Sequence, residues 1–194
     1  LIGALASDVV AKAAPGDVER QQRVTVAIDR LIEQLPMVPS VTDPTLVELG
    51  LDGIYRTWMA HPSRDEYWRA LSPREAWATI EVPALNVGGW YDVFIGGSLA
   101  NYTGMRASGG SDAARDGQRL IVGPWRHANP LLADPAGDIV FGLGSSGASL
   151  DMAAIHLRFF DHWLKGIGQE PPGSRVRLFV MGANAWREAD AWPL

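Results

Sequence analysis

Apolar residues recur at helical spacing near the start of the chain. The recurring positions are Val24, Ile28, Leu31, Ile32 and Leu35. Steps of three and four residues place these side chains on one stripe of a helix. The pattern therefore predicts a helix over residues 17–35 that packs one face and ends at Pro36.

Two further helix starts follow. Asp43 and Pro44 match an N-cap residue followed by proline at the first helical position, and His61 precedes the proline that ends this second helix. The apolar residues that we expect it to turn toward a core are Leu46, Ile54, Tyr55, Trp58 and Met59. Residues 72–75 (SPRE) match a capping box, in which the serine and glutamate side chains each bond a backbone amide, and they predict a short third helix.

The pattern changes at Val82. Residues 84–87 and 119–123 are apolar runs without polar alternation, which is typical of buried parallel strands, and each ends in a glycine pair or at Gly-Pro. A third strand is predicted over 175–181, and helices over 98–106 and 148–165. This alternation predicts an α/β fold with a parallel sheet, on which the helical first part packs as a cap.

Composition limits the classes of protein to consider. The chain has 194 residues, of which 47% are hydrophobic and 20% charged, as expected of a globular chain with a sizeable core. Its formal net charge of −5, without a basic block, argues against a nucleic-acid partner, and no apolar run approaches the roughly eighteen residues of a membrane span. The absence of cysteine excludes disulfides, thiolate metal sites and a cysteine nucleophile, but leaves the compartment open.

Two titratable residues follow consecutive predicted strands. Asp92 comes after the first strand, and His127 comes after the second, 35 positions later. Reactive groups gather past the carboxyl ends of parallel strands, so we expect the two loops to be neighbours. An acid before a histidine matches the second half of the Ser…Asp…His order of α/β-hydrolases, in which the carboxylate orients the imidazole that moves the serine proton. The alternative is that Asp92 caps the following helix and His127 is a loop residue bonded to backbone.

Four segments around these residues occur in a characteristic order. They are residues 88–94 (GGWYDVF), 119–127 (RLIVGPWRH), 157–166 (LRFFDHWLKG) and 176–187 (VRLFVMGANAWR), followed by Trp192 and Pro193. Together they resemble the cocaine esterase and X-Pro dipeptidyl-peptidase family of α/β-hydrolase serine hydrolases. The resemblance is strong over residues 82–194 and looser before them. It implies that Asp92 is the acid, and His127 the base, of a catalytic triad.

The resemblance also implies a division of the chain. Residues 1–80 would form a helical cap region, residues 81–181 an α/β-hydrolase core segment with the catalytic Asp and His, and residues 182–194 a linker toward a C-terminal jelly-roll domain. The family's nucleophile lies before the cap on a Gly-x-Ser-Tyr-x-Gly turn, which this sequence does not contain. Because the chain begins at Leu1 without an initiator Met, we expect the serine and the oxyanion donors to lie in a preceding segment.

The serines within the chain do not match the surroundings of a nucleophilic serine. Ser98 has no strand before it, as a nucleophile elbow requires, and is interpreted as a helix-start residue that caps backbone amides. Ser145 and Ser146 lie in a glycine-rich stretch. Residues 142–147 fit G-x-G-x-x-G, but residues 138–141 before them are too short for the strand of a dinucleotide fold. We therefore expect a flexible loop over the active-site edge and no cofactor.

The other histidines give no metal-site pattern. His156 and His162 are six positions apart on one helix, so they do not share a face and no zinc pair is expected. His162 is expected to be solvated beside Asp161, and His61 to be a turn or surface residue. The buried side of this helix is expected to comprise Phe159, Phe160, Trp163 and Leu164.

The tryptophans divide into two groups. Core packing is expected for Trp58, Trp68, Trp77 and Trp163. Trp90 and Trp125 each lie within two residues of a proposed catalytic group. They either bind substrate as walls of an apolar acyl pocket or pack to fix the two loops.

The sequence supports two functional hypotheses. The first is a serine hydrolase of esterase, acylase or X-Pro dipeptidyl-peptidase type, which cleaves a small-molecule ester or amide or a short peptide through an acyl-serine intermediate. The second is a non-catalytic α/β-hydrolase-like module that binds a ligand or partner. We expect the isolated chain to be inactive, and to aggregate or form a homo-oligomer through an unpaired strand edge near residues 84–87.

Overall fold

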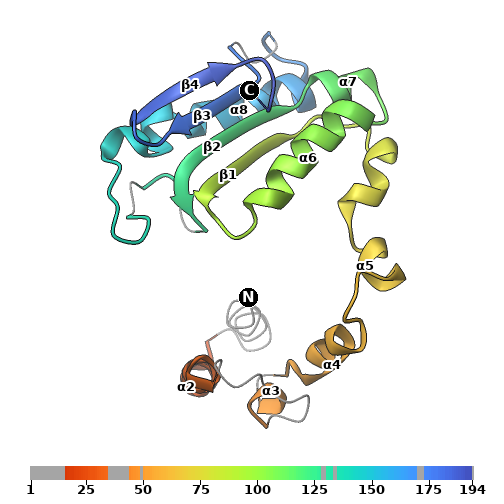
Figure 1. The fold of residues 1–194 in the computed structure, drawn as a ribbon, viewed down its shortest axis with the longest axis vertical. Helices are drawn as coiled ribbons and strands as arrows, with labels where there is room; N and C mark the ends of the chain where they lie inside the picture. Colours follow the sequence, from red (N-terminus) through yellow and green to blue (C-terminus); the bar gives the residue numbers. More distant parts are fainter. Residues whose placement is uncertain are drawn as a thin grey trace. The chain divides into compact units, whose positions relative to one another are not determined.

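The computed structural model describes residues 16–34, 44–48, 50–127, 130–132, 135–169 and 173–193. The chain divides into two compact units, Leu1–Leu71 and Ser72–Leu194. The boundary falls nine residues before the expected one at residue 80, because residues 73–79 pack on a helix of the second unit. Figure 1 shows the helical first unit and the sheet-containing second unit, each of which is described by itself.

The first unit is helical over its described residues. Its helices are α2 (Val18–Gln34), α3 (Pro44–Glu48), α4 (Asp52–Ala60) and α5 (Glu66–Ala70). Helix α2 confirms the first predicted helix, and Val24 and Ala27, one turn apart, are buried in it. The side chains of Ile28, Leu31 and Ile32, and the whole of Leu35, Pro36 and Asp43, lie outside the described residues.

The second predicted helix is divided into α3 and α4. Helix α3 begins at Pro44 as expected, but Gly50 adopts a positive φ of 68° between the two helices. Leu46 is fully buried, whereas Ile54 and Met59 are 41% and 48% exposed, so their predicted core positions are wrong. Helix α4 has no buried residue, so the segment after the break does not continue the buried face of α3.

The second unit is built on one sheet. Among its described residues, β1 (Leu85–Tyr91), β2 (Arg119–Arg126), β3 (Val176–Val180) and β4 (Ala185–Ala189) pair in that order. The first three strands are parallel, and β4 is antiparallel to β3. The α/β fold class is therefore confirmed, although the sheet is mixed rather than wholly parallel.

Helices cover both faces of this sheet. They are η1 (Pro73–Thr79), α6 (Ile95–Ser108), α7 (Asp112–Asp116), η2 (Leu143–Ser145), η3 (Ala148–Leu150) and α8 (Met152–Lys165). In Figure 1, α6 lies in front of the sheet and α8 behind it. The predicted eighteen-residue helix ending at Lys165 is shorter because Asp151, with a positive φ of 52°, separates η3 from α8. Helix α8 ends at Gly166 as expected, with the glycine in the left-handed conformation.

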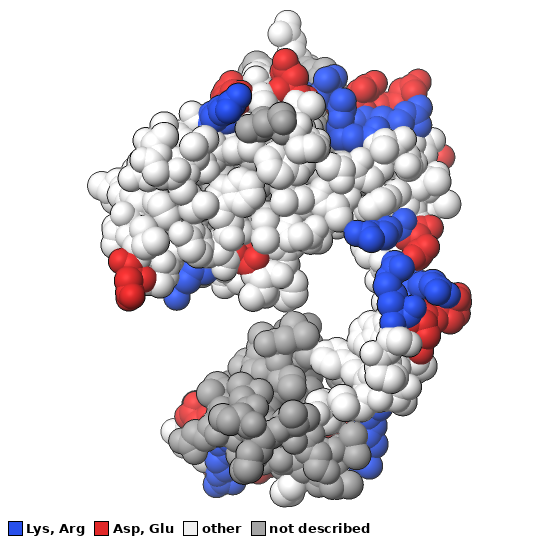
Figure 2. All heavy atoms as spheres, viewed as in Figure 1, with Lys and Arg blue, Asp and Glu red and all other residues white. Residues whose placement is uncertain are grey.

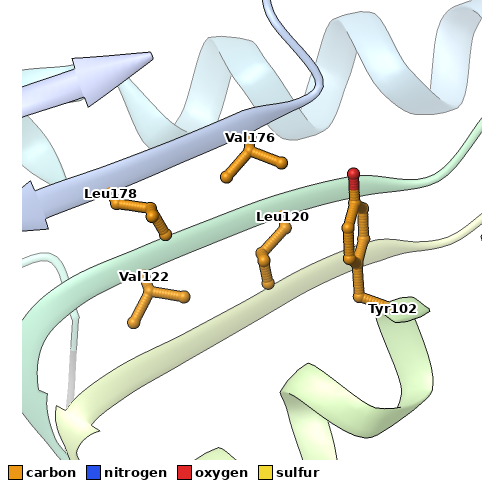
Figure 3. Packing of buried hydrophobic residues seen from close by; sticks show 5 residues of the cluster. All are labelled: Tyr102, Leu120, Val122, Val176 and Leu178. Carbon is orange, nitrogen blue, oxygen red and sulfur yellow. The ribbon is translucent and has the colours of Figure 1, made fainter. Parts of the chain in front are cut away.

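Alternate strand residues form two cores. On the α6 face, the buried cluster comprises Tyr102, Leu120, Val122, Val176 and Leu178 (Figure 3). On the α8 face, Ile121, Trp125 and Met152 form the second cluster. Both faces of β2 are thus buried, which explains its uninterrupted apolar sequence.

Within residues 182–194, where a linker was expected, Ala185–Ala189 form strand β4 of the sheet. A turn with positive φ at Gly182 and Asn184 reverses the chain, and β4 then pairs with the full length of β3. Trp186 contacts the rings of Trp125 and Phe179. The strand alternates weakly between exposed and half-buried positions, so its apolar pattern was too faint to predict it.

The segment before the sheet corrects the predicted capping box. Residues 73–79 form a 3-10 helix, in which Ser72 occupies the N-cap position without a side-chain cap bond. The indole of Trp77 packs against Gly104 of α6, and its Nε1–H donates to Asn101 Oδ1 at 3.3 Å. This contact joins the segment to the second unit.

A bulge near the ends of β1 and β2 shapes the edge of the sheet. Gly89 pairs with Gly123, but Tyr91 pairs with Arg126, so β2 contains an extra residue at this point. A Cβ at Gly89 would lie 2.1 Å from the carbonyl oxygen of Trp125. Glycine is therefore required there, and both strands run through the glycines that were expected to end them.

Gly89→Ala should lower the free energy of unfolding by about 1–3 kcal/mol, because a methyl group has no room beside the Trp125 carbonyl. Gly97→Ala is the matched control, since an added Cβ on that glycine of α6 meets nothing within 4 Å. Urea unfolding of the two variants measures the difference. Equal midpoints would contradict the tight approach of the two strands.

Candidate active site

Asp92 and His127 are the first residues after β1 and β2. Because these neighbouring strands are parallel, their carboxyl ends meet at one edge of the sheet. His127 Nδ1 lies 3.0 Å from Asp92 Oδ2, within hydrogen-bond distance. The structure thus brings together the two side chains that the spacing predicted to be neighbours, and their catalytic roles stay a prediction.

The turn after β1 fixes the carboxylate of Asp92. Its Oδ1 accepts a hydrogen bond from the Phe94 backbone N–H at 2.9 Å, while its own N–H donates to Gly89 O at 3.0 Å. The side chain is 15% exposed. One carboxylate oxygen therefore accepts a hydrogen bond within the turn that begins α6, as in the capping alternative, and the other contacts His127.

The pKa of Asp92 reflects opposing influences. Desolvation by burial raises the pKa, but the hydrogen bond from Phe94 and the hydrogen bond and charge of His127 lower it. The lowering influences prevail, so the pKa lies below the usual value for aspartate. Asp92 is consequently a carboxylate at neutral pH, and its Oδ2 accepts a hydrogen bond from His127 Nδ1–H.

The imidazole of His127 is oriented but accessible. Its side chain is 69% exposed, and its ring meets the ring of Phe94 edge-on, with centroids 4.9 Å apart. With Nδ1–H donating to Asp92, the other ring nitrogen, Nε2, is the acceptor of the neutral imidazole. This is the protonation pattern that a general base requires.

Phe94 is a site residue that the sequence reasoning missed. It contributes a backbone N–H to Asp92 and a ring to His127. A signal was available, because an aspartate commonly accepts from the N–H two residues later in an Asx-turn. The strand was predicted to end at the preceding glycines, whereas it continues to Tyr91 and the turn begins at Asp92.

Trp90 and Trp125 lie near the carboxyl ends of β1 and β2, and their indoles pack inside the fold. Trp90 Nε1–H donates to Phe179 O at 2.9 Å, and its ring contacts Trp192. Trp125 is 6% exposed, and its Nε1–H donates to Ser145 O at 2.8 Å. These are packing contacts that steady the two strand ends; a substrate-binding role for either indole stays a prediction.

The serines expected to be poor nucleophiles are engaged elsewhere. Ser98 lies within the first turn of α6, after the N-cap residue Phe94, so it is not the helix cap that we expected. Ser145 Oγ donates to Gly142 O and Ser146 Oγ to Leu143 O. Among the described serines, none is hydrogen-bonded to His127.

The glycine-rich stretch over residues 142–147 is folded against the second core. It forms η2, and Trp186 Nε1–H donates to Gly144 O at 2.8 Å. Ser145 and Ser146 are buried. These contacts differ from the flexible loop that we expected, because the indoles of β2 and β4 provide a surface for it to pack on.

The remaining histidines are separated in the fold. His156 Nδ1 bonds to Met152 O at 2.8 Å, and His61 Nδ1 lies 2.6 Å from Asp65 Oδ2. His162 Nδ1 is buried without a partner, which differs from the expected solvated residue, since Asp161 pairs with Lys165. Over the described part of the chain, no three His, Asp or Glu side chains are grouped as a metal site would require.

The aromatic side of α8 is only partly as expected. Phe159 is buried and contacts Trp163, but Phe160 and Leu164 are 47% and 76% exposed. Their predicted burial is wrong: Phe160 and Leu164 are four positions apart and share a face of α8 that is turned to solvent. The described helices include none that is long and apolar enough to cross a bilayer.

An α/β sheet with an acid and a histidine paired past adjacent strands defines the class of protein as hydrolase-like. The family model described as X-Pro dipeptidyl-peptidase (S15 family) matches residues 6–129. The chain therefore belongs to this family, as its four ordered segments indicated.

Individual relatives agree with this assignment. Cocaine esterase of Rhodococcus sp. (strain MB1 Bresler) is 38% identical over 135 residues, which cover 69% of this chain and 22% of the relative. An aminopeptidase from a marine sediment Thaumarchaeota archaeon has 27% identity and a TM-score of 0.58, over 73% of this chain and 23% of that one. An α-amino acid ester hydrolase has 22% identity and a TM-score of 0.60, over 79% and 25%, and supports the fold alone. The chain thus spans about a quarter or less of the length of these relatives.

The ionised state of Asp92 should contribute to stability in a defined pH range. Because its folded pKa lies below the unfolded value of about 3.9, the contribution is complete above that pH and is lost as the pH falls through the lowered folded pKa. Asp92→Asn retains an oxygen for the Phe94 N–H but has no charge to lose. We expect the stability difference between the two proteins in urea to be constant from pH 7 to 5 and to shrink below pH 4. A difference that grows below pH 4 would contradict the lowered pKa.

Proposed function

We propose that Asp92 and His127 are the acid and base of a Ser–His–Asp triad in a serine hydrolase that cleaves esters or amides. The observation that carries the proposal is the 3.0 Å contact between His127 Nδ1 and Asp92 Oδ2, beside an exposed imidazole. This geometry leaves Nε2 as the nitrogen that a serine hydroxyl would approach.

Membership of the family supports the proposal. Two of the relatives are described as an esterase and an aminopeptidase, names that refer to cleavage of an ester and of an amide bond. We infer a substrate of the same kind, a small-molecule ester or amide or a short peptide. The helical first unit, Leu1–Leu71, is proposed as the family's cap region.

The proposed reaction uses each nitrogen of His127 for one task. Nε2 accepts the proton of the serine hydroxyl while Oγ attacks the substrate carbonyl carbon. The imidazolium that forms is stabilised by the carboxylate of Asp92 through Nδ1–H. Nε2–H then protonates the alcohol or amine as it departs, and an acyl-serine remains. A water molecule activated by His127 hydrolyses this ester.

The serine itself is proposed to come from a preceding segment of the full-length protein. The hydroxyls of Ser145 and Ser146 donate to backbone oxygens, and no strand leads into Ser98, which lies in α6. A nucleophile elbow follows a strand, and β1 is an edge strand among the described strands, so another parallel strand could pair beside it. The donors of the oxyanion hole would be adjacent to that serine.

His127→Ala in the full-length protein should reduce kcat/KM for a p-nitrophenyl ester by about three orders of magnitude or more, because the serine loses its base. A fluorophosphonate probe should label one serine of the unmodified protein, and the variant should react much more slowly. His156→Ala is the matched control, since His156 is bonded to Met152 O within α8.

The same measurements distinguish the serine hydrolase from the alternative, a non-catalytic binding module. Turnover in His127→Ala equal to that of the control would remove the triad assignment. An unmodified protein that neither hydrolyses esters nor reacts with the probe would instead favour a non-catalytic binding module.

A further inference from the structure

A pocket of about 60 Å³ lies at the amino ends of the strands, away from the candidate active site. Leu85 and Arg119, the first residues of β1 and β2, both line it. Asp92 and His127 follow the last residues of these strands. A strand of seven residues spans about 23 Å, so the pocket and the Asp–His pair occupy opposite edges of the sheet.

Four basic side chains surround this pocket. They are Arg119, Arg158, Arg175 and Arg177. The chain as a whole has a net charge of −5, so this concentration is not a general property of its surface. On the face drawn in Figure 2, by contrast, the Lys and Arg atoms around α7 are mixed with Asp and Glu atoms.

Two of the four guanidinium groups have identified partners. Arg177 forms an ion pair with Glu188 of β4 at 2.6 Å. Arg119 Nη1 donates to the carbonyl oxygen of Gln118 at 3.2 Å. Within the described ranges, neither Arg158 of α8 nor Arg175 before β3 has an acidic partner. Among the residues that the structure describes, these two positive charges at the pocket therefore have no counter-charge.

The rest of the lining favours a small anion. Ile121 and Phe159 are buried apolar residues at the pocket, and they lower the local dielectric constant and strengthen interactions with charge. Ser174 adds a hydroxyl to the rim. The volume is sufficient for one small oxyanionic group.

We propose that this pocket binds one small oxyanionic group, a phosphate or a carboxylate, on the guanidinium groups of Arg158 and Arg175. Arginine suits this role because its planar fork of N–H donors matches two oxygens of such a group. The site is independent of ester hydrolysis, and a ligand from solution would enter at the edge of the sheet remote from the Asp–His pair.

Isothermal titration calorimetry of the full-length protein with inorganic phosphate tests the proposal. The ionic strength is held constant with sodium chloride, so that general screening contributes no signal. We expect saturable binding of one phosphate per chain. Arg158→Gln and Arg175→Gln should each weaken it about tenfold, the effect of losing a charged hydrogen-bond donor.

Arg115→Gln is the matched control, because Arg115 pairs with Asp112 on α7 and does not line the pocket. Its phosphate affinity should equal that of the unmodified protein, and circular dichroism should show that all three variants are folded. An unmodified protein without saturable binding would overturn the proposal, as would equal affinities in all three variants.

Discussion

The parallel pairing of β1 with β2 is the constraint on which the candidate site depends. It places two loops that are far apart in the sequence at one edge of the sheet. The bulge opposite Gly89 then sets how the end of β2 leaves the sheet, and a side chain at that glycine would collide with the Trp125 carbonyl. Asp92 and His127 come within hydrogen-bond distance because the backbone that precedes each of them is fixed in this way.

Local hydrogen bonds determine the electrostatics of the site. The carboxylate of Asp92 is mostly buried, which alone would favour its neutral form. The Phe94 N–H and His127 more than offset that desolvation, and both are supplied by residues immediately after the two strands. The acid–base half of the proposed triad is thus assembled by the second unit alone, whereas the nucleophile is proposed to come from another strand.

Much of this arrangement could be predicted from sequence. Uninterrupted apolar runs identified β1 and β2 because both faces of each strand are covered, and order along the chain identified Asp92 and His127. Strand β4 was missed because an antiparallel edge strand with exposed positions has no strong apolar pattern. The capping box at Ser72 failed for a different reason, since the packing of Trp77 on α6 fixes a 3-10 helix there. The contact between the rings of Phe94 and His127 could not be predicted, because it joins residues far apart in the sequence and the spacing of nearby residues carries no information about it.

The central claim is that His127 links Asp92 to a serine nucleophile. A crystal structure of the full-length protein after reaction with a fluorophosphonate would test it most directly. The account predicts that the labelled serine Oγ lies about 3 Å from His127 Nε2, with Nδ1 still bonded to Asp92. A labelled serine beyond hydrogen-bond reach of His127, or an imidazole separated from Asp92, would contradict it.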